Sequence, residues 1–176
     1  TTLKHFPGHG SSTKDTHKEM TDVTKLWDHT ELLPYKDLIA QKKVDAIMTA
    51  HIVNCKLDKE SLPATLSKII ITGLLRDSMK FNGVVFTDDM QMHAITKYYG
   101  LEQSILLAIN AGVDILLYSN NIAGSQEHQA TVVHRIIKDM VSNGMITETR
   151  IRESYKRIND MKKSIFLDYQ FPAAPK

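Results

Sequence analysis

The sequence lacks a second cysteine, a strong net charge and any long apolar run. Its single cysteine, Cys55, excludes an internal disulfide framework and a zinc site built from several cysteines, and we expect it to be structural. With 22 basic against 20 acidic side chains, the net charge of +2 does not support nucleic acid or an anionic membrane as an obligate partner. No apolar run approaches the ~18 residues of a membrane-spanning helix, and the first residues lack the apolar core of a signal peptide.

Alternating strands and helices are predicted along the 176 residues, of which 42% are hydrophobic, enough for the core of one domain. Short β-rich apolar runs predict strands at 2–6, 45–50, 83–87 and 113–118. The spacing of apolar residues predicts helices at 32–42, 66–80, 101–111, 125–142 and 147–165. Because the runs AIMTA, VVFT and DILLY are nearly continuous in apolar residues, we expect parallel strands covered on both faces, and therefore an α/β fold.

Glycines mark the helix ends in this pattern. Gly83 and Gly112 each stand between a predicted helix and the next strand, where glycine can adopt the left-handed conformation of a helix cap. Asn143 and Gly144 are expected to stop the following helix.

Polar residues gather just after each predicted strand. The groups are Lys4, His5 and His9; His51 and Asn54; Asp88 and Asp89; and Ser119, Asn120 and Asn121. In a parallel α/β fold the carboxyl ends of the strands open onto one face, where active sites form. The sequence therefore predicts a functional site at this face.

The segment Asp15-Thr16-His17 suits proton transfer. Its spacing places both side chains on one side of an extended segment, so the carboxylate can hydrogen-bond the imidazole and raise its basicity. A histidine with a reference pKa of ~6.5, held in this way, can give and take a proton near neutral pH. A solvated loop pair is the alternative interpretation.

Two adjacent acids, Asp88 and Asp89, follow a buried strand. Because consecutive residues of a strand point in opposite directions, we expect one of them to face a pocket and the other to cap the next helix. A carboxylate nucleophile opposite a proton donor is the layout of a retaining glycosidase, in which the donor is usually a second acid. Here the donor would be a histidine.

Other chemistries fit the sequence less well. The four histidines His5, His9, His17 and His51 show no H-x-H or HExxH spacing, and Lys4 would add positive charge to a metal site. GHGSS is neither the G-x-S-x-G elbow of a serine hydrolase nor part of a Walker motif. We therefore expect neither a metal nor a cofactor.

Four ordered segments resemble one enzyme family. KHFPGHGSSTKDTH, MTAHIVNCKLD, SLPATLSKIIITGLLRDSMKFNGVVFTDDMQMHAI and AINAGVDILL are similar to glycoside hydrolase family 3, in particular to its bacterial β-N-acetylglucosaminidase branch. The resemblance spans residues 3–118 and weakens in the C-terminal helices. Because the motifs occur in order, the match is more specific than any single pattern above.

The resemblance implies roles for individual residues. Asp88 matches the catalytic nucleophile of the family, whereas Asp89 occupies a variable position. Asp15 and His17 match a D-x-H dyad that acts as the acid/base on a loop. Substrate-binding residues of the family match Lys4 and His5, which bind sugar hydroxyls, and His51 at the rim of the next strand. In the same loop, Gly10-Ser11-Ser12 replaces the family's G-D-T.

Lys4 and His5 pose a geometric problem, because neighbouring residues of a strand face opposite sides. We expect a distortion of the backbone between them, such as a cis peptide bond not preceding proline, to turn both side chains toward the pocket.

The family fold is a (β/α)8 barrel of ~250 residues or more, and four strands with their helices make half of one. The chain resembles strands five to eight, and the aspartate and arginine with which earlier strands grip the sugar have no match here. We therefore expect residues 1–176 to form the C-terminal half of the catalytic barrel. The N-terminal half would come from a separate chain or from a swapped homo-oligomer.

The activity implied is that of a retaining glycoside hydrolase that removes terminal β-N-acetylglucosamine, or a related β-hexosaminide, from cell-wall fragments, as in peptidoglycan recycling. Phosphorolysis is an alternative, since a histidine acid/base would not repel phosphate as a carboxylate would. A barrel-derived binding module without catalysis and a metal-dependent hydrolase are two others. We expect the isolated chain to be inactive, because half of the sugar site is missing.

Overall fold

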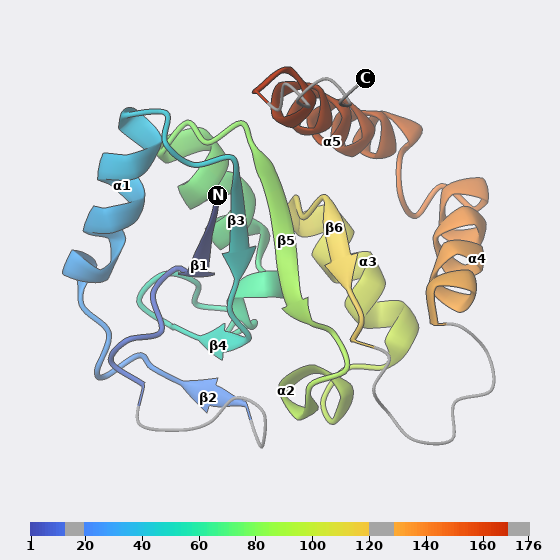
Figure 1. Ribbon diagram of the computed structural model, residues 1–176. Helices are drawn as coiled ribbons and strands as arrows, with labels where there is room; N and C mark the ends of the chain where they lie inside the picture. Colours follow the sequence, from blue (N-terminus) through green and yellow to red (C-terminus); the bar gives the residue numbers. More distant parts are fainter. Residues whose placement is uncertain (13–19, 120–128, 169–176) are drawn as a thin grey trace.

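A computed structural model describes residues 1–12, 20–119 and 129–168. Its main feature is a four-stranded parallel sheet in the order β1-β3-β5-β6 (Figure 1). The strands are β1 (Thr2–Phe6), β3 (Ala46–Thr49), β5 (Val84–Asp89) and β6 (Ile115–Leu117). The parallel α/β fold predicted from the apolar runs is confirmed. A second, two-stranded parallel sheet of β2 (Thr21–Asp22) and β4 (Ile52–Val53) was not predicted.

Helices follow the strands as expected, with differences at their ends. They are η1 (His29–Leu32), α1 (Leu33–Ala40), η2 (Ala64–Leu66), η3 (Ile69–Ser78), α2 (His93–Thr96), α3 (Leu101–Ala111), α4 (Gln129–Ser142) and α5 (Glu148–Asp168). The helix predicted at 32–42 begins earlier, as the 3-10 turn η1, because the Asp28 side chain accepts a hydrogen bond from the Thr30 N–H. The helix predicted at 66–80 is a 3-10 turn followed by the π-helix η3.

The main core lies between the sheet and the helices that follow its strands. Ile47 of β3 and Val85 of β5 are fully buried, and Ile71 of η3 and Ala108 of α3 pack in the same cluster. Strands β1 and β6 form the two edges of the sheet, and every residue of β6 is only partly buried. Among the described residues, no helix is both long enough and apolar enough to cross a membrane.

The two helix-capping glycines differ from each other. Gly112 ends α3 with a φ of 115°, the left-handed conformation that the sequence predicts. Gly83 does not have a positive φ, and Lys80 takes the left-handed position instead, with a φ of 59°. Glycine is needed at position 83 because a Cβ there would lie 2.5 Å from the carbonyl oxygen of Asp45.

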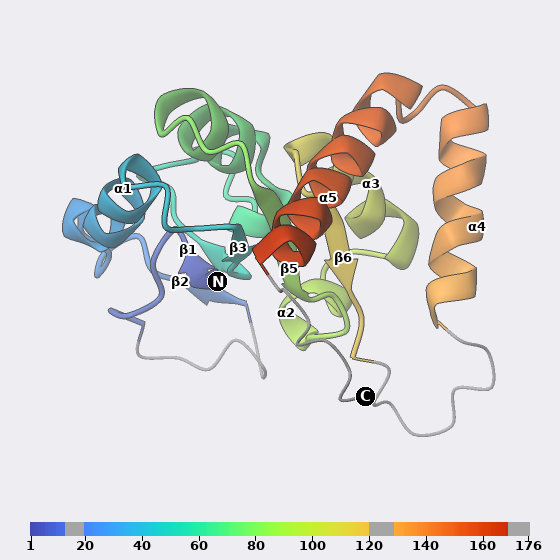
Figure 2. The same ribbon diagram turned by 45° about the horizontal axis from the view of Figure 1, so that its top comes forward.

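The strands of the sheet end on the side of the molecule where α2, β2 and β4 lie, and α5 crosses the opposite end (Figures 1 and 2). Asp114, just before β6, attaches α5 there with a side chain that is 0% exposed. Its carboxylate accepts hydrogen bonds from Arg157 and Ser154 of α5, at 3.1 and 2.6 Å, and lies 2.7 Å from Arg76 of η3. These contacts stabilise the fold at this end, whereas the carboxyl ends of the strands carry the candidate site.

Candidate active site at the carboxyl ends of the strands

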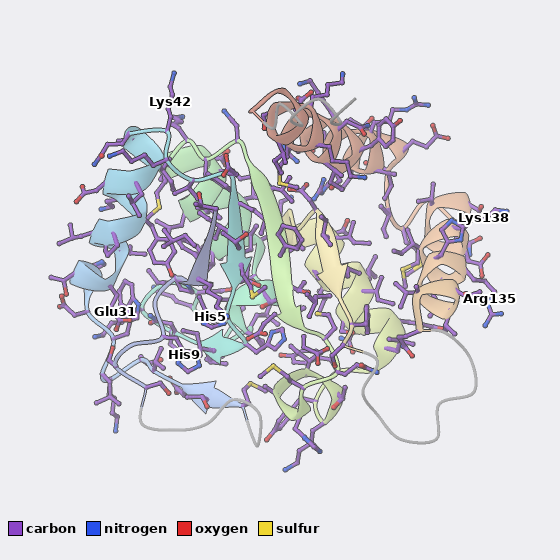
Figure 3. All side chains as sticks on the ribbon, in the orientation of Figure 1. His5, His9, Glu31, Lys42, Arg135 and Lys138 are labelled. Carbon is purple, nitrogen blue, oxygen red and sulfur yellow. The ribbon has the colours of Figure 1, made fainter. Side chains whose placement is uncertain are left out.

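The end of β1 brings a lysine and a histidine into one hollow. The peptide bond between Lys4 and His5 is cis, as the sequence analysis expected, and the pairing of β1 with β3 shifts register between Lys4 and Phe6. Lys4 and His5 line the same hollow together with His9. In Figure 3, His5 and His9 lie at this end of β1, with Glu31 toward α1.

Asp88 is the acid that remains accessible at the end of β5. Its side chain is 22% exposed, and its Oδ1 accepts a hydrogen bond of 2.8 Å from the Asp89 N–H. Its Oδ2 lies 3.9 Å from Nε2 of His5, whose side chain is 30% exposed. One carboxylate oxygen thus accepts a hydrogen bond from the backbone, while the other lies toward the imidazole of His5. A carboxylate in this position can act as a nucleophile or can stabilise positive charge.

Asp89 is occupied by contacts with the end of β6. Its Oδ2 accepts a hydrogen bond of 2.5 Å from the Ser119 hydroxyl, and its Oδ1 accepts from the N–H groups of Ser119 and Gln91. The expected helix cap is not made, because α2 begins at His93, with Met92 at its N-cap position. Asp89 caps the preceding turn instead. Of the two acids, Asp88 is therefore the one available for chemistry.

His51, which contacts the backbone of Asp89, is fully buried. Its Nδ1 lies 2.8 Å from Oγ1 of Thr65, and its Nε2 lies 3.0 Å from the carbonyl oxygen of Asp89. Both ring nitrogens are thus engaged within the protein. The sugar contact expected of His51 stays a prediction.

Glu31 was missed by the sequence analysis. Its carboxylate accepts hydrogen bonds from the Gly10 N–H, at 3.0 Å, and from the hydroxyl of Ser11. It therefore holds the loop after β1 at the point from which the segment with Asp15 and His17 continues. No local pattern could reveal this contact, because 21 residues separate Gly10 from Glu31.

The proposed acid/base dyad lies outside the described residues. Asp15 and His17 fall within 13–19, and Asn120 and Asn121 fall within 120–128, so their places stay predictions. Within 1–12, 20–119 and 129–168, no three His, Cys, Asp or Glu side chains are grouped as a metal site would require.

Comparisons with known proteins place these features in a family. The model of the glycosyl hydrolase family 3 N-terminal domain matches residues 1–161. A β-hexosaminidase of Tolumonas auensis is 40% identical over 70% of the chain, which spans 37% of that enzyme. The structure of a family 3 β-N-acetylglucosaminidase from Paenibacillus is 35% identical in sequence, with a TM-score of 0.81. The match covers 99% of the chain described here and 33% of the Paenibacillus chain. The structure of the β-glucoside phosphorylase BglX is 26% identical in sequence, with a TM-score of 0.80, and the match covers 99% of the present chain and 32% of the phosphorylase chain.

Proposed function

The chain belongs to glycosyl hydrolase family 3, and we propose that it forms half of the catalytic barrel of a retaining β-N-acetylhexosaminidase. The accessible carboxylate of Asp88 at the end of β5, facing His5 across 3.9 Å, is the observation that carries this proposal. Relatives with the name β-hexosaminidase and the Paenibacillus β-N-acetylglucosaminidase support the choice of sugar. The substrate is a terminal β-N-acetylglucosaminide, such as a cell-wall fragment.

The reaction begins with attack of an Asp88 carboxylate oxygen on the anomeric carbon. The bond from that carbon to the leaving oxygen breaks, and His17 gives its proton to this oxygen, so that a glycosyl-enzyme forms. His17 then takes a proton from water, which attacks the same carbon and releases the sugar with its original configuration. Asp15 keeps the imidazole of His17 basic and oriented. Lys4 and His5 bind sugar hydroxyls beside Asp88.

The sheet supports the half-barrel part of the proposal. It has four parallel strands with edges at β1 and β6, and the chain spans about a third of the family structures it matches. A complete barrel would need four further strands between these edges. The 176-residue chain alone should then have negligible turnover.

Phosphorolysis is the second candidate. The likeness to a β-glucoside phosphorylase over 99% of the chain favours it. A neutral or cationic histidine at the acid/base position also leaves room for a phosphate anion as the acceptor, which a carboxylate would repel.

The test is an assay of the full-length protein with an aryl β-N-acetylglucosaminide. We expect Asp88→Asn to lower kcat by at least about a thousandfold, because the nucleophile is lost. Asp160→Asn on α5, an exposed partner of Lys156, is the matched control and should leave kcat unchanged. Wild-type turnover in Asp88→Asn would refute the nucleophile assignment. Nuclear magnetic resonance of the first product should show the β anomer, and added phosphate should yield the sugar 1-phosphate only if the enzyme is a phosphorylase.

A further inference from the structure

A buried chain of polar side chains lies behind the accessible acid. Thr49, Thr65 and His51 are each 0% exposed. The hydroxyl oxygens of Thr49 and Thr65 are 2.8 Å apart, and Thr65 Oγ1 is 2.8 Å from His51 Nδ1. The other end of the imidazole meets the carbonyl oxygen of Asp89 at 3.0 Å. The chain thus joins the end of β3, the turn η2 and the end of β5.

Hydrogen-bond chemistry constrains the proton positions in this chain. A carbonyl oxygen only accepts, so Nε2 of His51 must carry the proton that it shares with Asp89. A neutral ring then leaves Nδ1 bare. We place the Thr65 hydroxyl proton on this nitrogen, 2.8 Å away, and not on the Ala50 carbonyl oxygen, which is 3.0 Å away and already accepts from the Thr65 N–H. Since that hydroxyl has a single proton, Thr49 must donate to Thr65 Oγ1.

The neutral form of the ring is the one that its surroundings favour. Burial has the largest effect and lowers the pKa of His51, against the hydrogen bond to Asp89 and the charge of Asp88, which raise it. In a charged ring Nδ1 would carry a proton and would donate it to Thr65 Oγ1. The Thr65 hydroxyl would then donate to the Ala50 carbonyl oxygen, 3.0 Å away.

We propose that His51 is a positioning residue of the active site, which fixes the carboxylate of Asp88 through residue 89. Its Nε2–H holds the carbonyl of Asp89, and the N–H of the same residue holds Oδ1 of Asp88 at 2.8 Å. Thr65 fixes the tautomer of the ring. The inference rests on the proposed role of Asp88 as the nucleophile and replaces a direct contact between His51 and the sugar.

The first test examines the ring itself and needs no activity. In the chain labelled with ¹⁵N-histidine, the His51 signals, assigned by their loss in His51→Gln, should show a protonated Nε2 and a bare Nδ1 at neutral pH. A ring protonated at Nδ1, alone or together with Nε2, would overturn the hydrogen-bond chain.

The second test separates positioning from sugar binding in the full-length protein. His51→Leu should lower kcat by about 10- to 100-fold, because a carboxylate that loses its support attacks from a poorer geometry, while KM stays within about threefold. His51→Gln should recover most of kcat, because one amide can donate to the Asp89 carbonyl and accept from Thr65. A raised KM with unchanged kcat in His51→Leu would identify a sugar contact instead. A glutamine variant as slow as the leucine variant would also contradict the proposal.

A milder pair of variants covers the case in which His51→Leu does not fold. Thr65→Val keeps the shape of the side chain but removes its hydroxyl, and should lower kcat about fivefold, whereas Thr65→Ser should restore it. Equal kcat in Thr65→Val and the wild type would refute the role of the chain. A wild-type protein without turnover would instead refute the proposed function, and the ¹⁵N signals would still decide whether the hydrogen-bond chain exists.

Discussion

Replacing Asp114 by asparagine should destabilise the fold strongly. The Asp114 carboxylate accepts hydrogen bonds from the Val85 N–H at 3.0 Å and from Ser154 at 2.6 Å, besides its arginine contacts. Removing one partner of a buried charge cluster costs about 3–5 kcal/mol, because the remaining charges stay buried without compensation. Since Arg157 is 22% exposed and can recover water, we expect about 3 kcal/mol. For a chain of this size the midpoint of thermal unfolding, Tm, should fall by roughly 6–12 °C.

Thermal unfolding followed by circular dichroism measures this effect. The control is Asp160→Asn, whose exposed ion pair with Lys156 on the same helix should contribute less than about 0.5 kcal/mol. If the two variants lost the same stability, α5 would not depend on Asp114, and the reasoning from buried charge would be wrong.

The pH dependence of the free energy of unfolding provides a second measurement of the contribution of Asp114. Burial would raise the pKa of Asp114, but Arg76, Ser154 and the other donors outweigh it, and the net pKa lies below the ordinary value. A lowered folded-state pKa means that the folded protein holds the proton less tightly than the unfolded chain does. The stabilisation is therefore present above about pH 4 and is lost as the pH falls toward the folded-state pKa. In Asp114→Asn, the free energy of unfolding should not show this loss as the pH falls below about 4.

Two further predictions concern glycine and the loop after β1. Gly112→Ala should lower the free energy of unfolding by about 1–2 kcal/mol, because φ is 115° and a Cβ would lie 2.9 Å from Thr72 Oγ1. Gly73→Ala, with no atom within 4 Å of its Cβ, is the control and should be neutral or stabilising in urea titrations. Glu31→Gln should lower kcat of the full-length enzyme about fivefold, because the carboxylate that holds Gly10 loses its charge. Unchanged kcat there would show that the loop does not depend on Glu31.

The sequence predicted the sheet more reliably than it predicted contacts across it. Apolar runs located all four strands of the main sheet within about two residues, because a buried parallel strand has to be apolar along its whole length. The strands β2 and β4 were missed, since two residues are too few to show a period.

The candidate site was predicted from the chain in part. Asp88 and His5 were located because polar residues that follow parallel strands gather at one face of the sheet. The cis peptide between Lys4 and His5 was expected because neighbouring residues of a regular strand face opposite sides. The burial of His51 could not be predicted, because a buried histidine and an exposed histidine look alike in sequence. Contacts such as that between Glu31 and Gly10 depend on how distant segments pack.

The order of the sheet has a consequence for how the domain assembles. Each strand of the main sheet pairs with the next one along the chain, so β3 pairs with β1 and β5, and β6 with β5. If a strand with the helix after it is taken as one unit, strand pairing connects each unit to its neighbours, as in repeat proteins. The stability of the fold is then approximately a sum over the interfaces between these units. Assembly can then proceed unit by unit along the chain. An edge of the sheet can accept one more unit in the same way, whether that unit comes from the same polypeptide or from another.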